Sequence, residues 1–281
     1  MREIHVSKIA KQVRNLFISA NYVIGPDVLN ALRQCQETEP SELGQMVLDQ
    51  IIKNDCLAAD EQMPICQDTG LAVLFVEYGQ DVHVVGGNFE QAVEEGVRQA
   101  YTEGYLRKSV VSDPLFARTN SGDNTPAVIH VRIVPGGNIR FLVTPKGFGS
   151  ENMSALKMLT PAAGVAGVTQ FVLDTVHQAG PNPCPPIIVG IGIGGTMDKA
   201  AELAKRATLR PIGSRNLDRR YADLEQELLE EINKTGIGPA GLGGLTTALA
   251  VNIEWYPTHI AGLPVAVNIV CHACRRQEAV I

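Results

Sequence analysis

The hydrophobic positions in the first third of the chain recur with helical spacing. Apolar stripes run from Val6 to Ala20, from Pro26 onward, and from Ser41 through MVLDQII. Apolar residues that recur every three or four positions form one face of an amphipathic helix, and Pro26 suits the first turn of the second stretch. The pattern therefore predicts three helices before the first long strand.

Strand-like apolar runs follow these helices. LAVLFVEYG and DVHVVGG precede a long helical pattern, NFEQAVEEGVRQAYTEGYLRK, after which comes AVIHVRIVPGGNIRFLVTPKG. Two apolar runs joined by a short glycine-containing turn are typical of a β-hairpin. We therefore expect the two strands on either side of PGGN to pair with each other in antiparallel fashion.

The second half alternates further helices and strands. Its helical segments are TPAAGVAGVTQFVLDTVHQ, DKAAELAKRA and LDRRYADLEQELLEEINK, and its strands lie in PPIIVGIGIGG, LTTALAVNIEWYP and IAGLPVAVNIVC. We find no internal repeat, low-complexity linker or abrupt shift in composition. The expected fold class is α+β, with one domain over residues 1–281, a mixed, mostly antiparallel sheet and surrounding helices.

Charge and hydropathy narrow the range of partners. The formal net charge is -6, and no block of Lys and Arg interrupts the acidic balance, which argues against nucleic acid as a partner. No apolar run approaches the roughly 20 residues of a membrane helix, and the N-terminal pattern lacks the apolar core of a signal peptide. We expect a cytoplasmic protein with no nucleic acid and no membrane among its partners.

The six cysteines differ in their surroundings. In a reducing compartment they are expected to be thiols or metal ligands rather than disulfides. Cys35 and Cys56 lie in helical patterns, where a cysteine usually serves as a small hydrophobic residue. Cys66, Cys184 and Cys271 each lie beside a strand, in a stretch marked by Pro or Gly. These three are candidates for a common metal centre.

Three thiolates from distant segments can bind a four-iron cluster and leave one iron without a protein ligand. An iron with an open position is a Lewis acid. Next to Cys66, the polar pair Gln67 and Asp68 would be costly to bury without specific partners. The stretch ICQDTG is therefore the first candidate for a functional site.

Two other motifs suggest different functions. GIGIGG fits the glycine pattern of a dinucleotide-binding turn, but the acidic residue expected about 20 positions later is missing. CHACRR spaces Cys271 and Cys274 as in a zinc or redox motif, but the sequence has no second close pair of ligands. A nucleotide-binding module and a zinc- or thiol-based structural or redox protein are thus the alternatives to a cluster enzyme.

Five motifs occur along the chain in a fixed order: ICQDTG, KGFGSEN, NPCPP, GIGGTMD and a late cysteine, Cys271, followed two residues on by Ala and then by Arg. In these motifs the chain resembles the iron–sulfur hydro-lyases, namely the class I fumarases and L-tartrate dehydratases. The resemblance extends from the N-terminal helices to CHACRR. Some members of the family are single long chains and others are split, and at 281 residues this chain resembles the α subunit of the split form.

The resemblance implies a metal site and its nearest polar neighbours. Cys66, Cys184 and Cys271 match the three ligands of a 4Fe–4S cluster. Cys274 stands where the family often has Asp, so it is not expected to be a ligand. Gln67 and Asp68 match the family's pair beside the first ligand, which contacts the substrate and its hydroxyl group.

Further residues follow from the same resemblance. Arg107 matches an arginine that holds a substrate carboxylate, as the planar guanidinium suits. Gly149 matches a glycine whose backbone approaches the substrate, and His259 a histidine near the active site. We expect Asp68 and His259 to be catalytic and Gln67 to bind substrate with Arg107 and Gly149.

The activity implied is reversible hydration of fumarate to L-malate, with L-tartrate dehydration as the alternative for this small dicarboxylate site. Removing a proton beside a carboxylate demands cations and a Lewis acid, and basic groups are scarce around the candidate residues. We therefore expect a β subunit to complete the active site and a dimer of αβ units to be the working enzyme.

Overall fold

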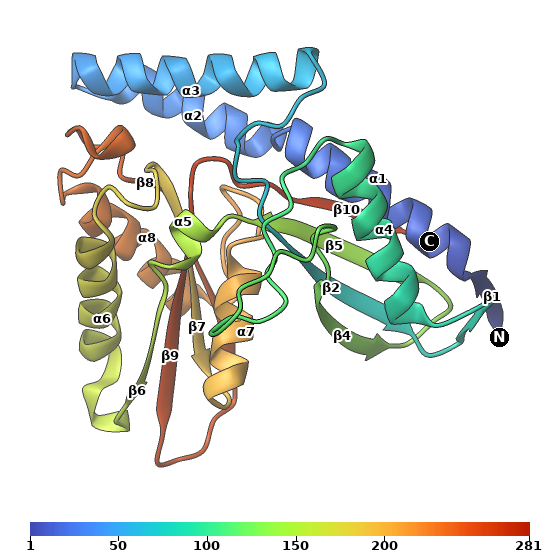
Figure 1. Ribbon diagram of the computed structural model, residues 1–281. Coiled ribbons are helices and arrows are strands. Elements are labelled where there is room, and N and C mark those ends of the chain that lie inside the picture. Colours follow the sequence, from blue (N-terminus) through green and yellow to red (C-terminus); the bar gives the residue numbers. More distant parts are fainter. The chain divides into compact units, whose positions relative to one another are not determined.

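The computed structural model describes residues 1–281, and the chain forms two compact units (Figure 1). The first unit consists of Met1–Ile24, Asp55–Phe148 and Arg275–Ile281, and the second of Gly25–Asn54 and Gly149–Cys274. The single catalytic domain expected over residues 1–281 is thus composed of two units, each with its own sheet and core.

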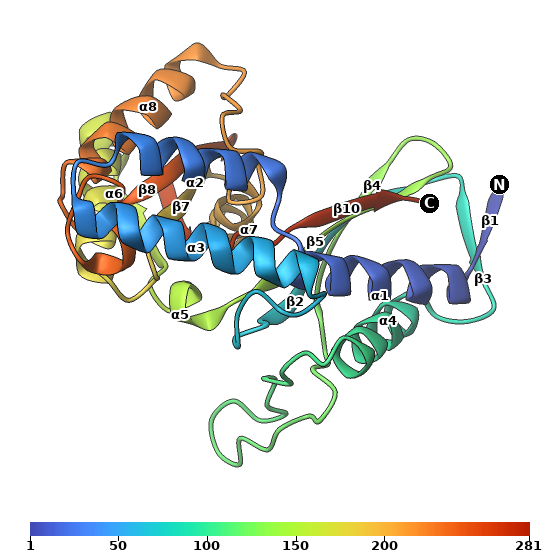
Figure 2. The same cartoon turned by 90° about the horizontal axis from the view of Figure 1, so that it is seen from above.

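The first unit is built on a four-stranded sheet in the order β10-β5-β2-β4. Helices α1 (Val6–Tyr22) and α4 (Phe89–Glu103) pack against each other and cover one face of this sheet (Figures 1 and 2). Their apolar faces meet the strands in one buried cluster that includes Phe17, Leu74, Tyr101 and Phe141. The strands are β2 (Leu71–Gly79), β4 (Val128–Val134), β5 (Ile139–Lys146) and β10 (Gln277–Val280), and a separate parallel pair joins β1 (Arg2–His5) to β3 (Val82–Val85).

The hairpin expected at PGGN is wrong, because β2 lies between the two strands that were expected to pair. β4 pairs with β2 in parallel and β5 pairs with β2 in antiparallel fashion. The PGGN turn instead contacts the end of β2, where the amides of Gly79 and Asp81 donate to the carbonyls of Asn138 and Gly136 at 2.9 and 3.0 Å. The buried apolar run of β2 thereby gains hydrogen-bonded neighbours on both edges.

The second unit has a four-stranded sheet in the order β6-β9-β7-β8. β7 (Ile187–Gly194) reads IIVGIGIG, so Gly190, Gly192 and Gly194 occupy one face, and Ile191 and Ile193 occupy the other. The isoleucine face packs against α6 (Gly164–Ala179) and α8 (Arg219–Asn233). The other strands are β6 (Ala155–Leu159), β8 (Ala248–Tyr256) and β9 (Leu263–Val270), and the short helices are α5 (Phe148–Glu151), η1 (Pro161–Ala163) and η2 (Pro239–Gly241).

The glycine face of β7 explains most of the GIGIGG motif. Helix α7 (Met197–Ala207) packs so closely here that a Cβ on Gly190 would lie 2.2 Å from the Ala204 carbonyl oxygen. A Cβ on Gly192 would lie 2.0 Å from the Ala200 carbonyl oxygen. Both distances are far below van der Waals contact, so these glycines are required for packing of the helix on the sheet.

The three helices expected in the first third are present, and the fold class is confirmed as α+β with mixed, mostly antiparallel sheets. Helices α2 (Pro26–Thr38) and α3 (Glu42–Asp60) lie side by side (Figures 1 and 2). None of the helices has both the length and the apolar character needed to span a membrane.

A buried carboxylate holds the α2–α3 connection to the glycine-rich loop of the second unit, residues 236–246. Glu39 accepts hydrogen bonds from the amides of Leu245 and Thr246 at 3.0 and 2.7 Å, and from the Ser41 amide at 3.2 Å. Burial alone would raise the pKa of Glu39, but hydrogen bonds from Thr246, Leu245 and Ser41 outweigh it and lower that pKa. The charged carboxylate is therefore the stabilising form.

We predict that Glu39→Gln lowers the free energy of unfolding at pH 7 by about 2 kcal/mol, the usual worth of hydrogen bonds to a charged group. Because the pKa of Glu39 is lowered by folding, its stabilisation is present above the unfolded pKa near 4.3 and is lost as the pH falls through the folded pKa. Denaturant titrations at pH 7 and pH 3 measure both effects. Glu37→Gln on the exposed end of α2 is the control, and equal losses in the two variants would contradict the prediction.

Candidate active site

The loop from Cys66 to Gly70 presents the candidate catalytic residues of the first unit. The Asp68 amide points toward the Cys66 sulfur at 3.4 Å. The Asp68 carboxylate accepts from the Gly70 amide at 3.0 Å through Oδ1 and from the Phe148 amide at 2.9 Å through Oδ2. Two backbone donors thus fix the orientation of this half-buried carboxylate.

A buried arginine that sequence analysis missed holds the same loop. Arg275 is only 3 % exposed, and its Nη1 donates to the Asp68 carbonyl oxygen at 2.6 Å and to Asn21 Oδ1 at 3.0 Å. Phe148 and Arg275 are also the residues at which the chain passes between the two units. Asp68 is therefore fixed by the ends of two segments of the first unit.

The motif KGFGSEN places Gly147 against the Asp68 carboxylate. A Cβ on Gly147 would lie 3.2 Å from both Asp68 Oδ2 and Arg275 Nη2, so a side chain here would crowd both groups. Gly149, the expected residue, would place a Cβ no closer than 3.9 Å, to the Asn182 carbonyl oxygen. Lys146, at the end of β5, is fully buried and donates to the Gly147 carbonyl oxygen at 3.2 Å.

Arg107 lies beside the same loop. The Thr69 hydroxyl donates to the Arg107 carbonyl oxygen at 3.1 Å, and the Arg107 side chain is exposed. One buried side chain reinforces this arrangement. Asn124 accepts from the Ser109 amide at 2.7 Å and donates to the Gly70 carbonyl oxygen at 3.2 Å. The structure therefore brings Gln67, Asp68 and Arg107 together within the first unit.

Tyr101 supports the same loop from the interior of the first unit. Its hydroxyl donates to the carbonyl oxygens of Thr69 and Gly70 at 2.7 and 2.9 Å. The side chain is completely buried, and this burial raises the pKa of Tyr101 well above its usual value. Tyr101 is therefore a neutral donor at any physiological pH and has a structural role.

In the second unit, two candidate ligands lie at the same end of the sheet. Cys184 precedes β7 and Cys271 follows β9, and the amide of His272 is directed at the Cys184 carbonyl oxygen at 3.5 Å. Cys184 is exposed and has a φ of 55°, a conformation that is uncommon for a residue with a side chain. Such backbone strain is concentrated at functional sites.

The remaining cysteines are less accessible. Cys274 is completely buried, and its thiol donates to the Thr208 carbonyl oxygen at 3.6 Å. Cys35 and Cys56 lie in α2 and α3 and are partly buried. Among the six free thiols, Cys184 is the only exposed one.

His259 does not lie near the two cysteines of the second unit. It belongs to the turn between β8 and β9, where its Nδ1 accepts from the Ala261 amide at 3.1 Å. Cys271 lies at the other end of β9, and a strand of 8 residues spans about 26 Å. His259 instead lines an apolar pocket of about 400 Å³ together with Val165 and Ile260.

The thiol chemistry fits an iron–sulfur cluster, although no three His, Cys, Asp or Glu side chains are gathered into one metal-binding group. Cys184 and Cys271 come from the second unit and are held at adjacent positions by the His272 backbone. Cys66 comes from the first unit and is partly exposed. Thiolate sulfur from exposed, rigid loops is the donor type that such clusters use.

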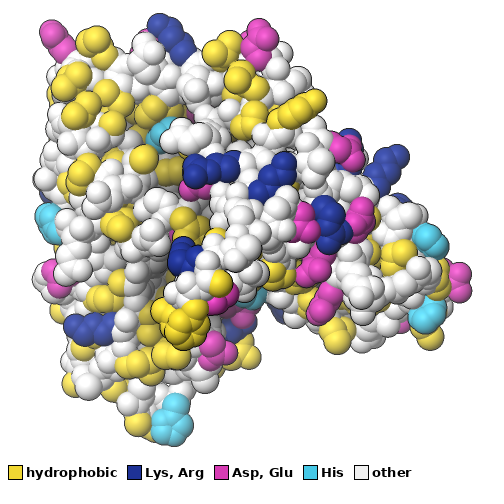
Figure 3. Space-filling model, in the orientation of Figure 1, with side chains coloured by type: hydrophobic (Ala, Val, Ile, Leu, Met, Phe, Trp, Pro, Cys, Tyr) yellow, Lys and Arg dark blue, Asp and Glu magenta, His cyan; other side chains and the backbone are white.

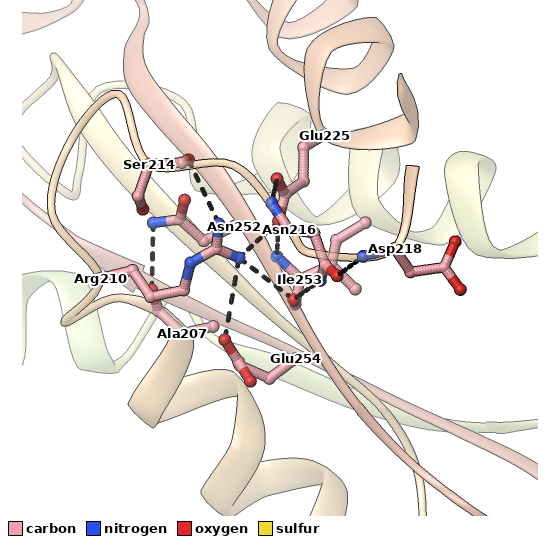
Figure 4. Close-up of polar contacts among 9 residues, drawn as sticks. All are labelled: Ala207, Arg210, Ser214, Asn216, Asp218, Glu225, Asn252, Ile253 and Glu254. Carbon is pink, nitrogen blue, oxygen red and sulfur yellow. Dashed lines mark hydrogen bonds and ion pairs between the residues drawn. The ribbon is translucent and has the colours of Figure 1, made fainter. Parts of the chain in front are cut away.

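The segment about 20 positions after GIGIGG, where a dinucleotide-binding fold would carry an acidic residue, has a structural role instead (Figure 4). Arg210 forms an ion pair with Glu225 at 2.6 Å and reaches Glu254 at 3.8 Å, so its charge is already compensated. Asp218 caps α8 by accepting from the Arg220 amide at 2.9 Å. Figure 3 also shows acidic and basic side chains interspersed over the visible face.

Comparison with known proteins agrees with the motifs. The family model described as Fumarate hydratase (Fumerase) matches residues 10–280. A Methanocaldococcus jannaschii protein named "Putative L(+)-tartrate dehydratase subunit alpha" is 46% identical over 274 residues, covering 96% of each chain. The "L(+)-tartrate dehydratase subunit alpha" of Escherichia coli strain K12 is 33% identical over 280 residues, covering 98% of this chain and 91% of that protein.

The chain therefore belongs to the class I fumarate hydratase family of hydro-lyases. Within that family it is an α subunit, since its whole length aligns with the α subunits of tartrate dehydratases.

We predict that iodoacetamide modifies Cys184 rapidly in the folded protein prepared without iron, because this thiol is exposed. Cys274 should be modified only after denaturation, because it is buried. Mass spectrometry of tryptic peptides over time measures both rates. Modification of Cys274 as fast as Cys184 in the native protein would show that the burial described here is wrong.

Proposed function

We propose that this chain is the α subunit of an iron–sulfur fumarate hydratase, which adds water reversibly to fumarate to form L-malate. The observation that carries the proposal is the double attachment of the Asp68 loop, next to Cys66, by the Phe148 amide and by Arg275. A carboxylate fixed beside a candidate iron ligand and near Arg107 is suited to proton transfer at a bound dicarboxylate.

Cys66, Cys184 and Cys271 would hold a 4Fe–4S cluster, and its iron without a protein ligand would supply a Lewis acid for the hydroxyl group. Geometry within the second unit supports two members of the set, because the His272 amide is directed at the Cys184 carbonyl oxygen and joins the loops that carry Cys184 and Cys271.

The side chains of the loop have separate tasks in this proposal. Asp68 takes up and returns the hydroxyl proton, and its two backbone donors keep it oriented toward the substrate. Gln67 is exposed and free to bind the substrate by hydrogen bonding. Arg107 holds one substrate carboxylate, and the backbone at Gly149 approaches the substrate.

Any role for His259 at the same site needs a second copy of the chain. Within one copy, the length of β9 separates it from Cys271 by about 26 Å. In a dimer of αβ units, the β8–β9 turn of one α subunit could reach the site of its neighbour. We therefore propose a catalytic role for His259 only in the dimer.

A β subunit supplies the remaining cations in this proposal, and the α-subunit names of the relatives imply a second subunit for those enzymes. The second candidate substrate is L-tartrate, which the names of those relatives favour. L-Malate and L-tartrate differ by one hydroxyl group. A pocket built to hydrogen-bond that group discriminates strongly against a compound that lacks it.

The experiment that tests the function is anaerobic co-expression with the neighbouring candidate β chain, followed by assays on L-malate, fumarate and both tartrates. We expect fumarate hydration by the complex and negligible turnover by the α chain alone. Exclusive use of L-tartrate would identify the second candidate. Full activity of the isolated chain would contradict the requirement for a β subunit.

We predict that replacing Cys66, Cys184 or Cys271 by Ser abolishes the visible absorbance of the anaerobically reconstituted protein, because oxygen substitutes poorly for thiolate on iron. Cys274→Ser is the control and should keep the absorbance, since Cys274 is bonded to Thr208 in the interior. Loss of the cluster in Cys274→Ser but not in Cys271→Ser would reverse the assignment of the third ligand.

We predict that Asp68→Asn keeps the cluster absorbance and leaves KM nearly unchanged, while kcat falls by roughly 10²–10⁴-fold. Because both carboxylate oxygens accept amide hydrogen bonds, the variant also loses about 1–3 kcal/mol of stability. Asn21→Ala serves as the control, since it removes a partner of Arg275 but leaves the carboxylate intact. A near-normal kcat in Asp68→Asn would limit Asp68 to capping the turn.

A further inference from the structure

A pocket of about 480 Å³ lies beside Cys184 in the second unit. One wall is the face of α3 between Leu43 and Asn54, on which Val47 and Ile51 are half-buried. The opposite wall consists of Cys184, Pro185, Ala240 and His272. The helix therefore presents a mainly aliphatic surface to an exposed thiol that is a candidate iron ligand.

Hydrogen bonds fix the loops that form the opposite wall. The Ala240 amide donates to the Pro185 carbonyl oxygen at 2.8 Å, and the His272 amide is directed at the Cys184 carbonyl oxygen at 3.5 Å. These contacts join the start of β7, the glycine-rich loop and the end of β9 around one thiol. The wall that carries Cys184 is therefore held in place from three segments.

The helical wall is fixed at its N-terminal end. Glu39, just before α3, binds the amides of Leu245 and Thr246 in the same glycine-rich loop. The Gly44 amide donates to the Ser41 hydroxyl at 3.1 Å, and a Cβ at Gly44 would lie 2.9 Å from Glu39 Cγ. Helix α3 is thus attached next to the pocket rather than lying loosely over it.

We propose that the Val47–Ile51 face of α3 is a screen that limits the access of water and oxygen to iron bound at Cys184. This inference rests on the proposed function, because it requires the cluster. The apolar shell around a metal site controls solvent access and the local dielectric. Hydrophobic side chains also lie along the upper margin of Figure 3, where Figure 1 draws α3.

The test compares Ile51→Ala with Ile52→Ala in the full chain, after anaerobic reconstitution of the cluster. Both variants remove the same atoms from half-buried neighbours on one helix, but only Ile51 lines the pocket. On exposure to air, the decay of cluster absorbance should be several-fold faster in Ile51→Ala than in the parent protein. Ile52→Ala should decay at the parent rate, and Ile51→Val should decay nearly as slowly.

A second measurement separates access from folding. The rate of iron removal by a small chelator under anaerobic conditions should rise in Ile51→Ala, while the melting temperatures of Ile51→Ala and Ile52→Ala stay similar. Equal decay and chelation rates in the two variants would overturn the screen and leave the proposed function intact. A parent protein that binds no cluster at all would instead overturn the proposed function, and the screen with it.

Discussion

The candidate site depends on the attachment of Asp68 to two distant segments of the chain. The Phe148 amide fixes the carboxylate, and the Arg275 guanidinium fixes the carbonyl group of the same residue. A side chain at Gly147 would crowd both groups, because its Cβ would lie 3.2 Å from Asp68 Oδ2 and from Arg275 Nη2. Without these contacts, a polar loop next to Cys66 would have no defined conformation, and proton transfer demands a defined one.

The two units contribute different kinds of geometry. The first unit orders polar groups around a loop, with Tyr101 and Asn124 satisfying its carbonyl oxygens from the interior. The second unit orders thiols at the end of a sheet, where strand pairing fixes the spacing between the loop before β7 and the loop after β9.

Much of the architecture could be predicted from local patterns. The helices from Val6, Pro26 and Ser41 follow from periodicity, which also places Cys35 and Cys56 within helices. The burial of Cys274 has no local signal, because it depends on packing against Thr208, distant in sequence. The PGGN hairpin was wrong because β2, distant in sequence, competes for both strands. Arg275 was missed because an arginine after a cysteine carries no signal of its partners, Asn21 and Asp68, which are distant in sequence.

The insertion of β2 between β4 and β5 also determines the order in which the site can form. β4 and β5 cannot pair directly, so each must find β2, and β10 then adds to the free edge of β5. Contacts that join distant parts of a chain form slowly, because the intervening loop must first close. Arg275 lies two residues before β10, so it reaches Asp68 only when that last strand docks. During synthesis, the loop that carries Cys66 and Asp68 can be held by Tyr101, Asn124 and Phe148 first, and it gains its buried arginine only after the final strand of its sheet has left the ribosome.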